Sequence, residues 1–168
     1  YVGPDDTSAG YAWFPGSDQT LGYITVSISK GSYSVKSEYI KVIVDHTYGK
    51  TDNVVIDTGH SEKHSTDDIK DATNRVIDKF KDFEGCTLTK LWYDEERSNT
   101  QIESYMTGGR GSINGVSKDN VMVLLSEFTV DASGGDGSLN PNSTYSNWMW
   151  ILIRDSIEGE WRVDDWGY

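Results

Sequence analysis

The pattern of residues 67–83 constrains the fold of this chain more than any other feature. Apolar residues recur there at spacings of three or four, which places them on one face of an amphipathic helix: Ile69, Ala72, Val76, Phe80 and Phe83. Ser65 or Thr66 is a good N-cap, the two following aspartates put negative charge in the first turn, and Gly85 suits the turn that ends the helix. The segment therefore predicts a helix whose apolar face must be covered by another layer.

After this helix the apolar residues follow the spacing of strands. We expect strands at 86–96, 100–108, 120–130, 146–156 and 160–168. The runs VMVLLSEF and WMWILIR are almost continuously apolar, as is typical of central strands covered on both faces. A helix followed by an antiparallel meander predicts an α+β fold, with the amphipathic helix packed across a curved antiparallel sheet.

The N-terminal third has a different composition. Residues 1–22 are rich in Gly, Ser, Asp and Pro and predict an arm or linker. Residues 23–29 and 35–45 are rich in β-branched residues and flank a KGSY turn, so they predict a hairpin, and residues 53–57 predict a further short strand. Because a chain of 168 residues with 36% apolar content has material for one core, we expect a single α+β domain over 23–168.

The chain is acidic, with a net charge of −12. Such a surface repels phosphate backbones, and no basic cluster offsets it, so we expect no nucleic-acid partner. No apolar run approaches the roughly 20 residues that cross a bilayer. Because the chain begins at Tyr1 without Met, we expect any membrane attachment to come from an N-terminal anchor that precedes it. The single cysteine, Cys86, excludes an internal disulfide and is expected to be a buried, inert thiol.

Four unusual blocks carry a resemblance to a known family. They are KDFEGCTLTKLWYDEERS (81–98), VLLSEF (123–128), SGGDGSLNPNSTYSNWMWILIRD (133–155) and GEWRVDDWGY (159–168). Through them the chain from about residue 56 to 168 resembles a family of uncharacterised extracellular domains of Gram-positive bacteria with NTF2-like or cystatin-like folds. Its members are secreted or lipid-anchored proteins, or the outer part of membrane metallopeptidases similar to β-lactam sensors. The resemblance implies an extracellular or cell-envelope location and brings no known catalytic residues.

One short motif suggests protease chemistry. The run VVIDTGH (54–60) contains Asp57-Thr58-Gly59, which is how aspartic proteases carry a catalytic aspartate. That chemistry needs two carboxylates that share a proton, and no second Asp-Thr/Ser-Gly occurs in the chain. We therefore interpret the motif as a strand end followed by a turn.

Two segments suggest metal binding. His60 and His64 lie four residues apart, a spacing that suits zinc on a helix, although both precede the predicted N-cap. The loop ASGGDGSLNPNS offers Asp131, Asp136 and Asn140 as oxygen ligands for calcium. It departs from EF-hand spacing, so the alternative is a hairpin loop held by Asx turns.

The acidic run 94–96 is a weaker candidate for acid–base chemistry. If the run continues a strand, Asp94 and Glu96 share one side, and a solvated strand end is the simpler interpretation. We expect Arg154 and Arg162, in neighbouring strands, to pair with some of these acids across the sheet.

The aromatic residues supply the remaining candidate site. In a helix-on-sheet fold the open end between helix and sheet is the usual ligand pocket. We expect that pocket to be lined by Trp92, Tyr105, Trp148 and Trp150. The alternative is that the aromatic side chains of the C-terminal strands pack in the core and at the sheet edge.

These features favour a non-catalytic extracellular binding or sensing domain of the bacterial cell envelope. The sequence holds no nucleophile with a base, no metal cage and no phosphate loop, and we expect no cofactor. Two alternatives stay open: an NTF2-like enzyme that uses an Asp or Glu in an aromatic-lined pocket, and an interaction module that meets a partner protein through its N-terminal arm or an exposed strand edge. The ligand, a small molecule or a protein, and the oligomeric state are left open.

Overall fold

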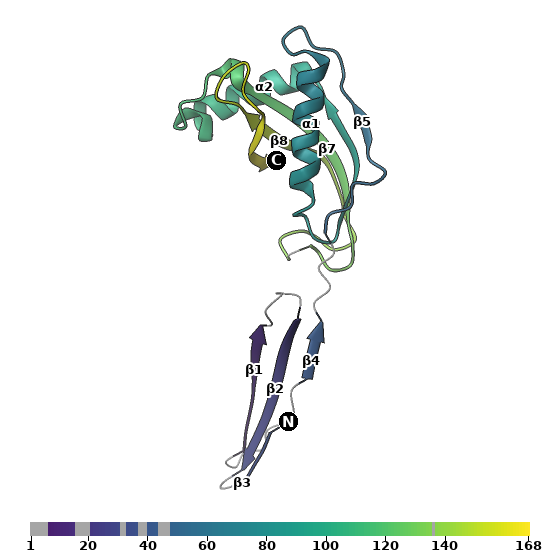
Figure 1. Cartoon of the computed structure of the whole chain (residues 1–168), viewed down its shortest axis with the longest axis vertical. Helices are drawn as coiled ribbons and strands as arrows, with labels where there is room; N and C mark the ends of the chain where they lie inside the picture. The colour runs from purple at the N-terminus through teal and green to yellow at the C-terminus, as the bar shows by residue number, and fades with distance from the viewer. Residues whose placement is uncertain (1–6, 16–20, 31–32, 37–39, 44–47, 136) are drawn as a thin grey trace. The chain divides into compact units, whose positions relative to one another are not determined.

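A computed structural model of the chain describes all residues except 1–6, 16–20, 31–32, 37–39, 44–47 and 136. The chain divides into two compact units, Tyr1–His46 and Thr47–Tyr168, and each is described by itself. Figure 1 labels most of the helices and strands of the two units. No helix in the described part of the chain is long and apolar enough to span a membrane.

The first unit is a sheet of four strands: β1 (Thr7–Pro15), β2 (Leu21–Lys30), β3 (Tyr33–Lys36) and β4 (Ile40–Ile43). β1 runs antiparallel along β2. On its other side β2 pairs antiparallel with β3 through its C-terminal part and with β4 through its N-terminal part. These pairings confirm the hairpin predicted from residues 23–29 and 35–45. The predicted arm, 1–22, contains β1, and the boundary between an arm and a domain at 22/23 stays a prediction.

The second unit contains a five-stranded sheet with two helices. The strands lie in the order β5 (Val55–Asp57), β6 (Cys86–Tyr93), β7 (Val121–Val130), β8 (Thr144–Ile153) and β9 (Arg162–Gly167). β5 is parallel to β6, and the other neighbours are antiparallel. Figure 1 shows α1 (Thr66–Phe80) lying across one face of the curved, open sheet. The α+β fold with a helix across a sheet is confirmed, and the sheet is mixed because β5 joins it in parallel.

α1 follows its sequence pattern closely. Ser65 is the N-cap, and its hydroxyl oxygen accepts a hydrogen bond from the backbone N–H of Asp68 at 3.1 Å. Ile69, Ala72, Val76 and Phe80 are buried as predicted, but the helix ends at Phe80 and not at residue 83, so Phe83 lies beyond it and is half-buried. Because the cap satisfies an otherwise unpaired N–H and the periodic face meets the sheet, local and tertiary preferences agree.

The predicted strand at 100–108 is wrong, because these residues form most of α2 (Glu95–Gly108). Asp94 is its N-cap and accepts a hydrogen bond from the N–H of Arg97 at 2.9 Å, so the acidic run 94–96 is a helix start and not a strand end. Ile102 and Tyr105, three residues apart, are buried against β7. The backbone N–H of Val123 donates to the hydroxyl of Ser98 at 3.1 Å, which ties α2 to that strand.

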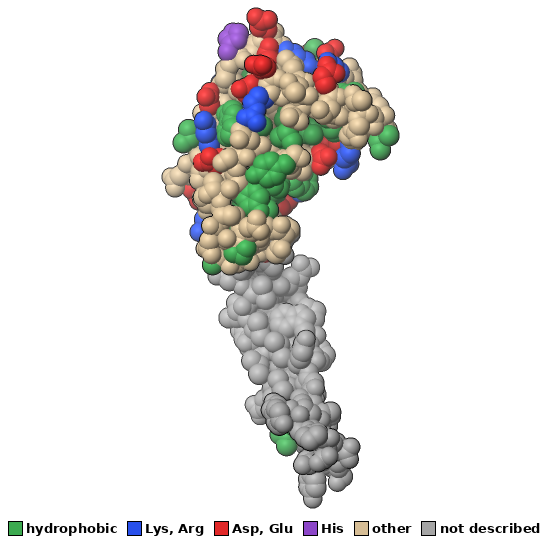
Figure 2. Space-filling model, turned by 180° about the vertical axis from the view of Figure 1, so that it is seen from behind, with side chains coloured by type: hydrophobic (Ala, Val, Ile, Leu, Met, Phe, Trp, Pro, Cys, Tyr) green, Lys and Arg blue, Asp and Glu red, His purple; other side chains and the backbone are tan. Residues whose placement is uncertain are grey.

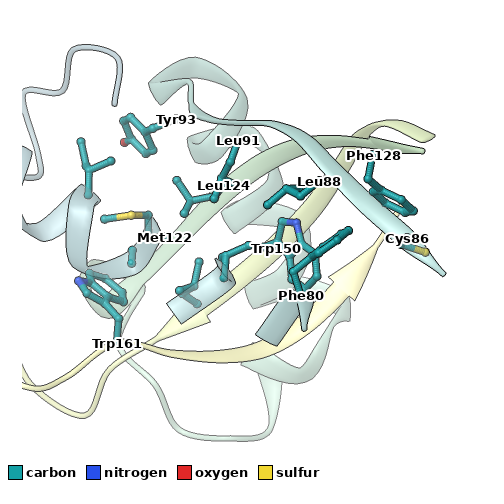
Figure 3. Close-up of a cluster of buried hydrophobic side chains, with 14 of the residues drawn as sticks. Phe80, Cys86, Leu88, Leu91, Tyr93, Met122, Leu124, Phe128, Trp150 and Trp161 are labelled. Carbon is teal, nitrogen blue, oxygen red and sulfur yellow. The ribbon is translucent and has the colours of Figure 1, made fainter. Parts of the chain in front are cut away.

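The main core lies between α1 and the sheet. Figure 3 shows Phe80 and Trp150 side by side within it, with Trp161 toward one end and Phe128 and Cys86 toward the other. Trp150 is 0% exposed, and its indole N–H donates to the hydroxyl of Ser126 at 2.9 Å. A second, smaller cluster lies under α2 on the opposite face, because alternate residues of β7 point to opposite sides. Cys86 is buried, as predicted.

Candidate functional site

Aromatic side chains gather where α1 ends. The ring of Phe83, in the turn after the helix, lies 5.2 Å from that of Trp150 and 6.3 Å from each of those of Trp148 and Trp166. Trp148 in turn lies 5.3 Å from Tyr168. These residues come from the helix end, β8, β9 and the C-terminal residue, so the tertiary fold brings together aromatic groups that are distant in the sequence.

A cavity of about 190 Å³ opens beside these rings. We call it the aromatic pocket. Nine residues line it: Lys79, Asp82, Phe83, Glu84, Gly135, Ser138, Leu139, Trp148 and Trp166. Its walls therefore combine aromatic faces with one basic and two acidic side chains, and Trp166 is 42% exposed, which is high for a large apolar residue.

The Gly-rich loop between β7 and β8 forms one wall of the aromatic pocket. It is tied to the turn after α1 by a hydrogen bond from the N–H of Asp131 to the carbonyl of Gly85, at 2.9 Å. Gly85 has a φ of 66°, and a Cβ there would lie 2.6 Å from the hydroxyl oxygen of Ser133. Only glycine fits this close approach, so the sequence fixes the loop against the helix end.

Two of the three charged side chains of the aromatic pocket, Lys79 and Asp82, are paired with each other. The ammonium group of Lys79 lies 4.7 Å from the ring centroid of Trp166 and 3.0 Å from the carboxylate of Asp82. The indole N–H of Trp148 is buried and has no hydrogen-bond partner among the described residues. The pocket therefore offers a ligand its aromatic faces and the side chains of Lys79 and Asp82.

The four predicted ligand residues do not converge. Trp148 lines the aromatic pocket, and Trp150 lies behind it in the core. Tyr105 is on α2, on the opposite face of the sheet. Trp92 is half-buried beside Lys90, whose ammonium group lies 4.9 Å from the indole centroid. The structure thus brings together Trp148 and Trp150 only.

Lys79 and Asp82 were not predicted as pocket residues, and Trp166 was expected to pack in the core or at the sheet edge. Lys79 and Asp82 have the spacing of an ordinary exposed ion pair at a helix end, so the sequence holds no signal for them. Trp166 lies opposite Trp150 only because β9 pairs with β8 in the observed register.

The candidate calcium loop is organised by turns in its described part. The hydroxyl and the backbone N–H of Ser133 donate to the carboxylate of Asp131, and these hydrogen bonds hold the pKa of that carboxyl below its usual range. The N–H of Asn140 donates to the hydroxyl of Tyr145 at 3.0 Å. Asp136 lies outside the described residues. No three His, Cys, Asp or Glu side chains are placed to hold a metal ion in the part of the chain that is described, and calcium binding stays a prediction.

The Asp57-Thr58-Gly59 motif forms the strand end and turn that we expect. Asp57 ends β5, is exposed, and its carboxylate accepts a hydrogen bond from the N–H of Gly59 at 2.9 Å. Gly59 adopts a φ of 58°, which suits the turn. Asp57 is therefore used as a turn acceptor.

Polar groups gather at the other end of α1. Arg154 is 4% exposed, pairs with Asp68 at 2.9 Å, and lies 4.4 Å over the ring of Trp161. The predicted pairing of Arg154 and Arg162 with the acidic run 94–96 is wrong, since Arg162 pairs with Asp155 at 2.7 Å. The run has already turned into α2, so its side chains do not lie on the strand that was expected.

His64 is buried at this same end, 6% exposed, with its ring 5.8 Å from that of Trp161. Burial and the nearby charges of Lys63 and Arg154 lower the pKa of His64 to about 4. His60, by contrast, is exposed. The two histidines predicted as a possible zinc pair therefore have different environments.

A third polar group lies under α2. The hydroxyl of Tyr105 donates to Asp164 at 2.6 Å and accepts from the amide of Asn114 at 2.7 Å, while Arg110 lies 3.3 Å from the same carboxylate. Burial and Asp164 raise the pKa of Tyr105. Asp164 is thus a partly buried carboxylate with partners on its Oδ2, and it does not line the aromatic pocket.

By its geometry the second unit is an α+β domain with a helix across a curved mixed sheet and an aromatic pocket at the helix end. Residues 61–167 match the family model described as Domain of unknown function (DUF4829), and because the match covers more than half of the chain, the chain belongs to this family. The match lies within the second unit. No curated protein and no solved structure matches the sequence.

Proposed function

We propose that this chain is a non-catalytic binding or sensing domain of the bacterial cell envelope, that it acts outside the cell, and that it holds a small ligand in the aromatic pocket. The resemblance of residues 56–168 to extracellular domains of Gram-positive bacteria supports the location. That resemblance allows two settings: a freestanding lipoprotein, or the outer part of a membrane peptidase. In both, the domain recognises a ligand and carries out no chemistry on it.

The observation that carries the proposal is the exposure of Trp166 beside a cavity. An indole that is 42% exposed leaves apolar surface in water, and a ligand that covers it recovers that free energy. The adjacent side chains of Lys79, Asp82 and Glu84 supply charged groups at the same place. An apolar cavity with a few convergent polar groups is the usual form of a small-molecule site.

The space-filling view (Figure 2) shows exposed hydrophobic side chains that lie next to one another. Figure 2 shows one face of the second unit, on which hydrophobic side chains gather between acidic and basic groups. Elsewhere in this unit the exposed large apolar residues include Ile113, at 85%, and Ile157, at 71%. Only the group around Trp166 has a cavity lined by several aromatic rings among the described pockets.

The enzyme alternative has weaker support. The best-buried carboxylate in a cavity is Asp164, whose side chain is 12% exposed, and it lines a polar cavity of about 330 Å³ with Arg154, Arg162 and Asn114. Tyr105 and Arg110 both contact its Oδ2, and the hydrogen bond from Tyr105 fixes α2 against β9. The aromatic pocket itself contains the carboxylates of Asp82, which is paired with Lys79 at 3.0 Å, and Glu84, and the enzyme alternative would need one of them to act as the acid–base catalyst.

The test is a ligand screen on the full chain. Neutral, cationic and anionic small molecules are tested by thermal melting with the wild type, Trp166→Leu and Ile113→Ala. A ligand at 100 times its Kd stabilises the wild type by about 2.7 kcal/mol. The proposal expects this stabilisation to be kept in Ile113→Ala, which removes an exposed apolar side chain outside the pocket, and to be lost in Trp166→Leu. If no charge class stabilises the wild type, or if Trp166→Leu responds fully, the proposal fails.

A further inference from the structure

The surfaces of the aromatic pocket favour positive charge. The faces of Trp and Phe rings carry partial negative charge and attract cations within about 6 Å of the ring centroid. Asp82 and Glu84 add carboxylates to the same walls. The pocket also lies at the C-terminal end of α1, where the helix dipole places partial negative charge. Three independent features therefore have the same electrostatic sign.

The protein already places one cation in this position. The ammonium group of Lys79 lies 4.7 Å from the centroid of the Trp166 ring and 3.0 Å from the carboxylate of Asp82. Its side chain is 34% exposed, and an exposed ion pair of this kind is held weakly. A ligand cation can therefore displace Lys79 into solvent at little energetic cost and take over both contacts.

The volume limits the size of the group that enters. At about 190 Å³ the cavity is smaller than the roughly 300–1,000 Å³ of pockets that enclose a drug-sized ligand. It therefore admits a head group of a few non-hydrogen atoms and leaves the rest of the ligand outside. An alkylammonium head group, which is what Lys79 itself presents, fits this limit.

We propose that the aromatic pocket binds the alkylammonium group of a small organic cation, and that Lys79 is a tethered stand-in which competes with it. This proposal rests on the proposed function, since it names the chemistry of the ligand held in the same pocket. The net charge of −12 raises the local concentration of cations around the protein and so adds to the effect.

The experiment compares three probes with the same carbon chain and different charge: n-butylammonium, n-butanol and butyrate. Dissociation constants are measured with the full chain by NMR titration at one fixed ionic strength, because salt screens exposed charges. n-Butylammonium is expected to bind most tightly and butyrate least. A lysine-containing tripeptide blocked at both ends is titrated in parallel. If the tripeptide binds no more tightly than n-butylammonium, the site is assigned to small organic cations.

Two lysine variants separate displacement from a general charge effect. Lys79→Met removes the competing ammonium group and is expected to tighten n-butylammonium binding by about three- to tenfold, the factor that corresponds to losing a cation–π contact and an exposed ion pair. Lys90→Met is the matched control, because Lys90 also lies over an indole, that of Trp92, at 4.9 Å, and its loss changes the net charge equally. It is expected to leave the dissociation constant within about twofold.

The outcomes distinguish this proposal from the proposed function. If butyrate or n-butanol binds most tightly, or if Lys79→Met weakens n-butylammonium binding, the cation proposal is overturned while the pocket remains a binding site. Stronger binding of the blocked tripeptide than of n-butylammonium overturns the assignment to a small cation in favour of a peptide. If none of the probes binds, the cation proposal is overturned. The screen of neutral, cationic and anionic small molecules then decides the proposed function.

Discussion

His64 gives the sharpest prediction about stability. The imidazole is buried between the rings of Tyr93 and Trp161. The charged groups that face it are Lys63 and Arg154, which oppose a further positive charge, and Asp68 and Glu95, which favour one. Burial is the largest influence, and together with the two cations it lowers the pKa of His64 from 6.5 to about 4.

The sign and size of the pH effect follow from that shift. Because the folded state binds the proton less tightly than the unfolded state, the stabilisation is complete above pH 6.5 and is lost as the pH falls toward 4. Between about pH 7 and pH 5 the free energy of unfolding is expected to fall by roughly 1.5–2 kcal/mol from this group alone. The carboxylates contribute mainly below that range, since the pKa of Asp68 and that of Glu95 are lowered.

The assay is urea unfolding of the wild type, His64→Leu and His60→Leu at a series of pH values from about 7 to 5. His64→Leu replaces the imidazole with an apolar side chain of similar size and removes the titration, so its stability should be nearly flat over this range. His60→Leu changes an exposed histidine and should follow the wild type. Equal slopes for the wild type and His64→Leu would refute the reasoning that His64 is buried in its neutral form.

Four further substitutions test the packing of the core, the turn after α1 and the N-cap of α1. Trp150→Ala empties a fully buried site and should lower the free energy of unfolding by about 3–5 kcal/mol, measured by urea unfolding. Gly85→Ala and Gly115→Ala form a matched pair: both have positive φ, but only Gly85 is crowded, so Gly85→Ala should destabilise by at least about 1 kcal/mol more, and equal losses would contradict the close approach. Ser65→Ala removes the N-cap of α1 and should lower the midpoint of thermal unfolding by an amount equivalent to about 1 kcal/mol; no change would mean that the cap contributes nothing.

The sequence predicts α1 well and α2 poorly, for physical reasons. In α1 a strong cap, acidic first-turn residues and four apolar residues at spacings of three or four all favour the same structure. In α2 the apolar positions are few, and Thr100, Ile102 and Tyr105 are also good strand formers. The decisive signal was Asp94 followed by two glutamates, which is a helix N-terminus and was interpreted as a strand end.

The pocket is harder to predict because it depends on which strands pair in which register. Trp92 lies on β6 and Trp150 on β8, and both strands pair with β7. Trp92 pairs with Leu125, whereas Trp150 pairs with Leu124, the adjacent residue of β7. Since adjacent residues of a strand face opposite sides, the two indoles are on different faces of the sheet. Irregularities between Ser126 and Glu127 and between Ile151 and Leu152 shift the register further.

The central claim is that the aromatic pocket is the ligand site, and the indole N–H signals of the six tryptophans test it most directly. The full chain, labelled with ¹⁵N in tryptophan, is titrated with n-butylammonium and separately with n-butanol. The account predicts saturable shifts of the Trp148 and Trp166 signals, and no shift for Trp161, which lies at the other end of α1. Saturable shifts confined to Trp92 or Trp161 would contradict it, whereas no shift of any indole with either probe would overturn the cation proposal alone.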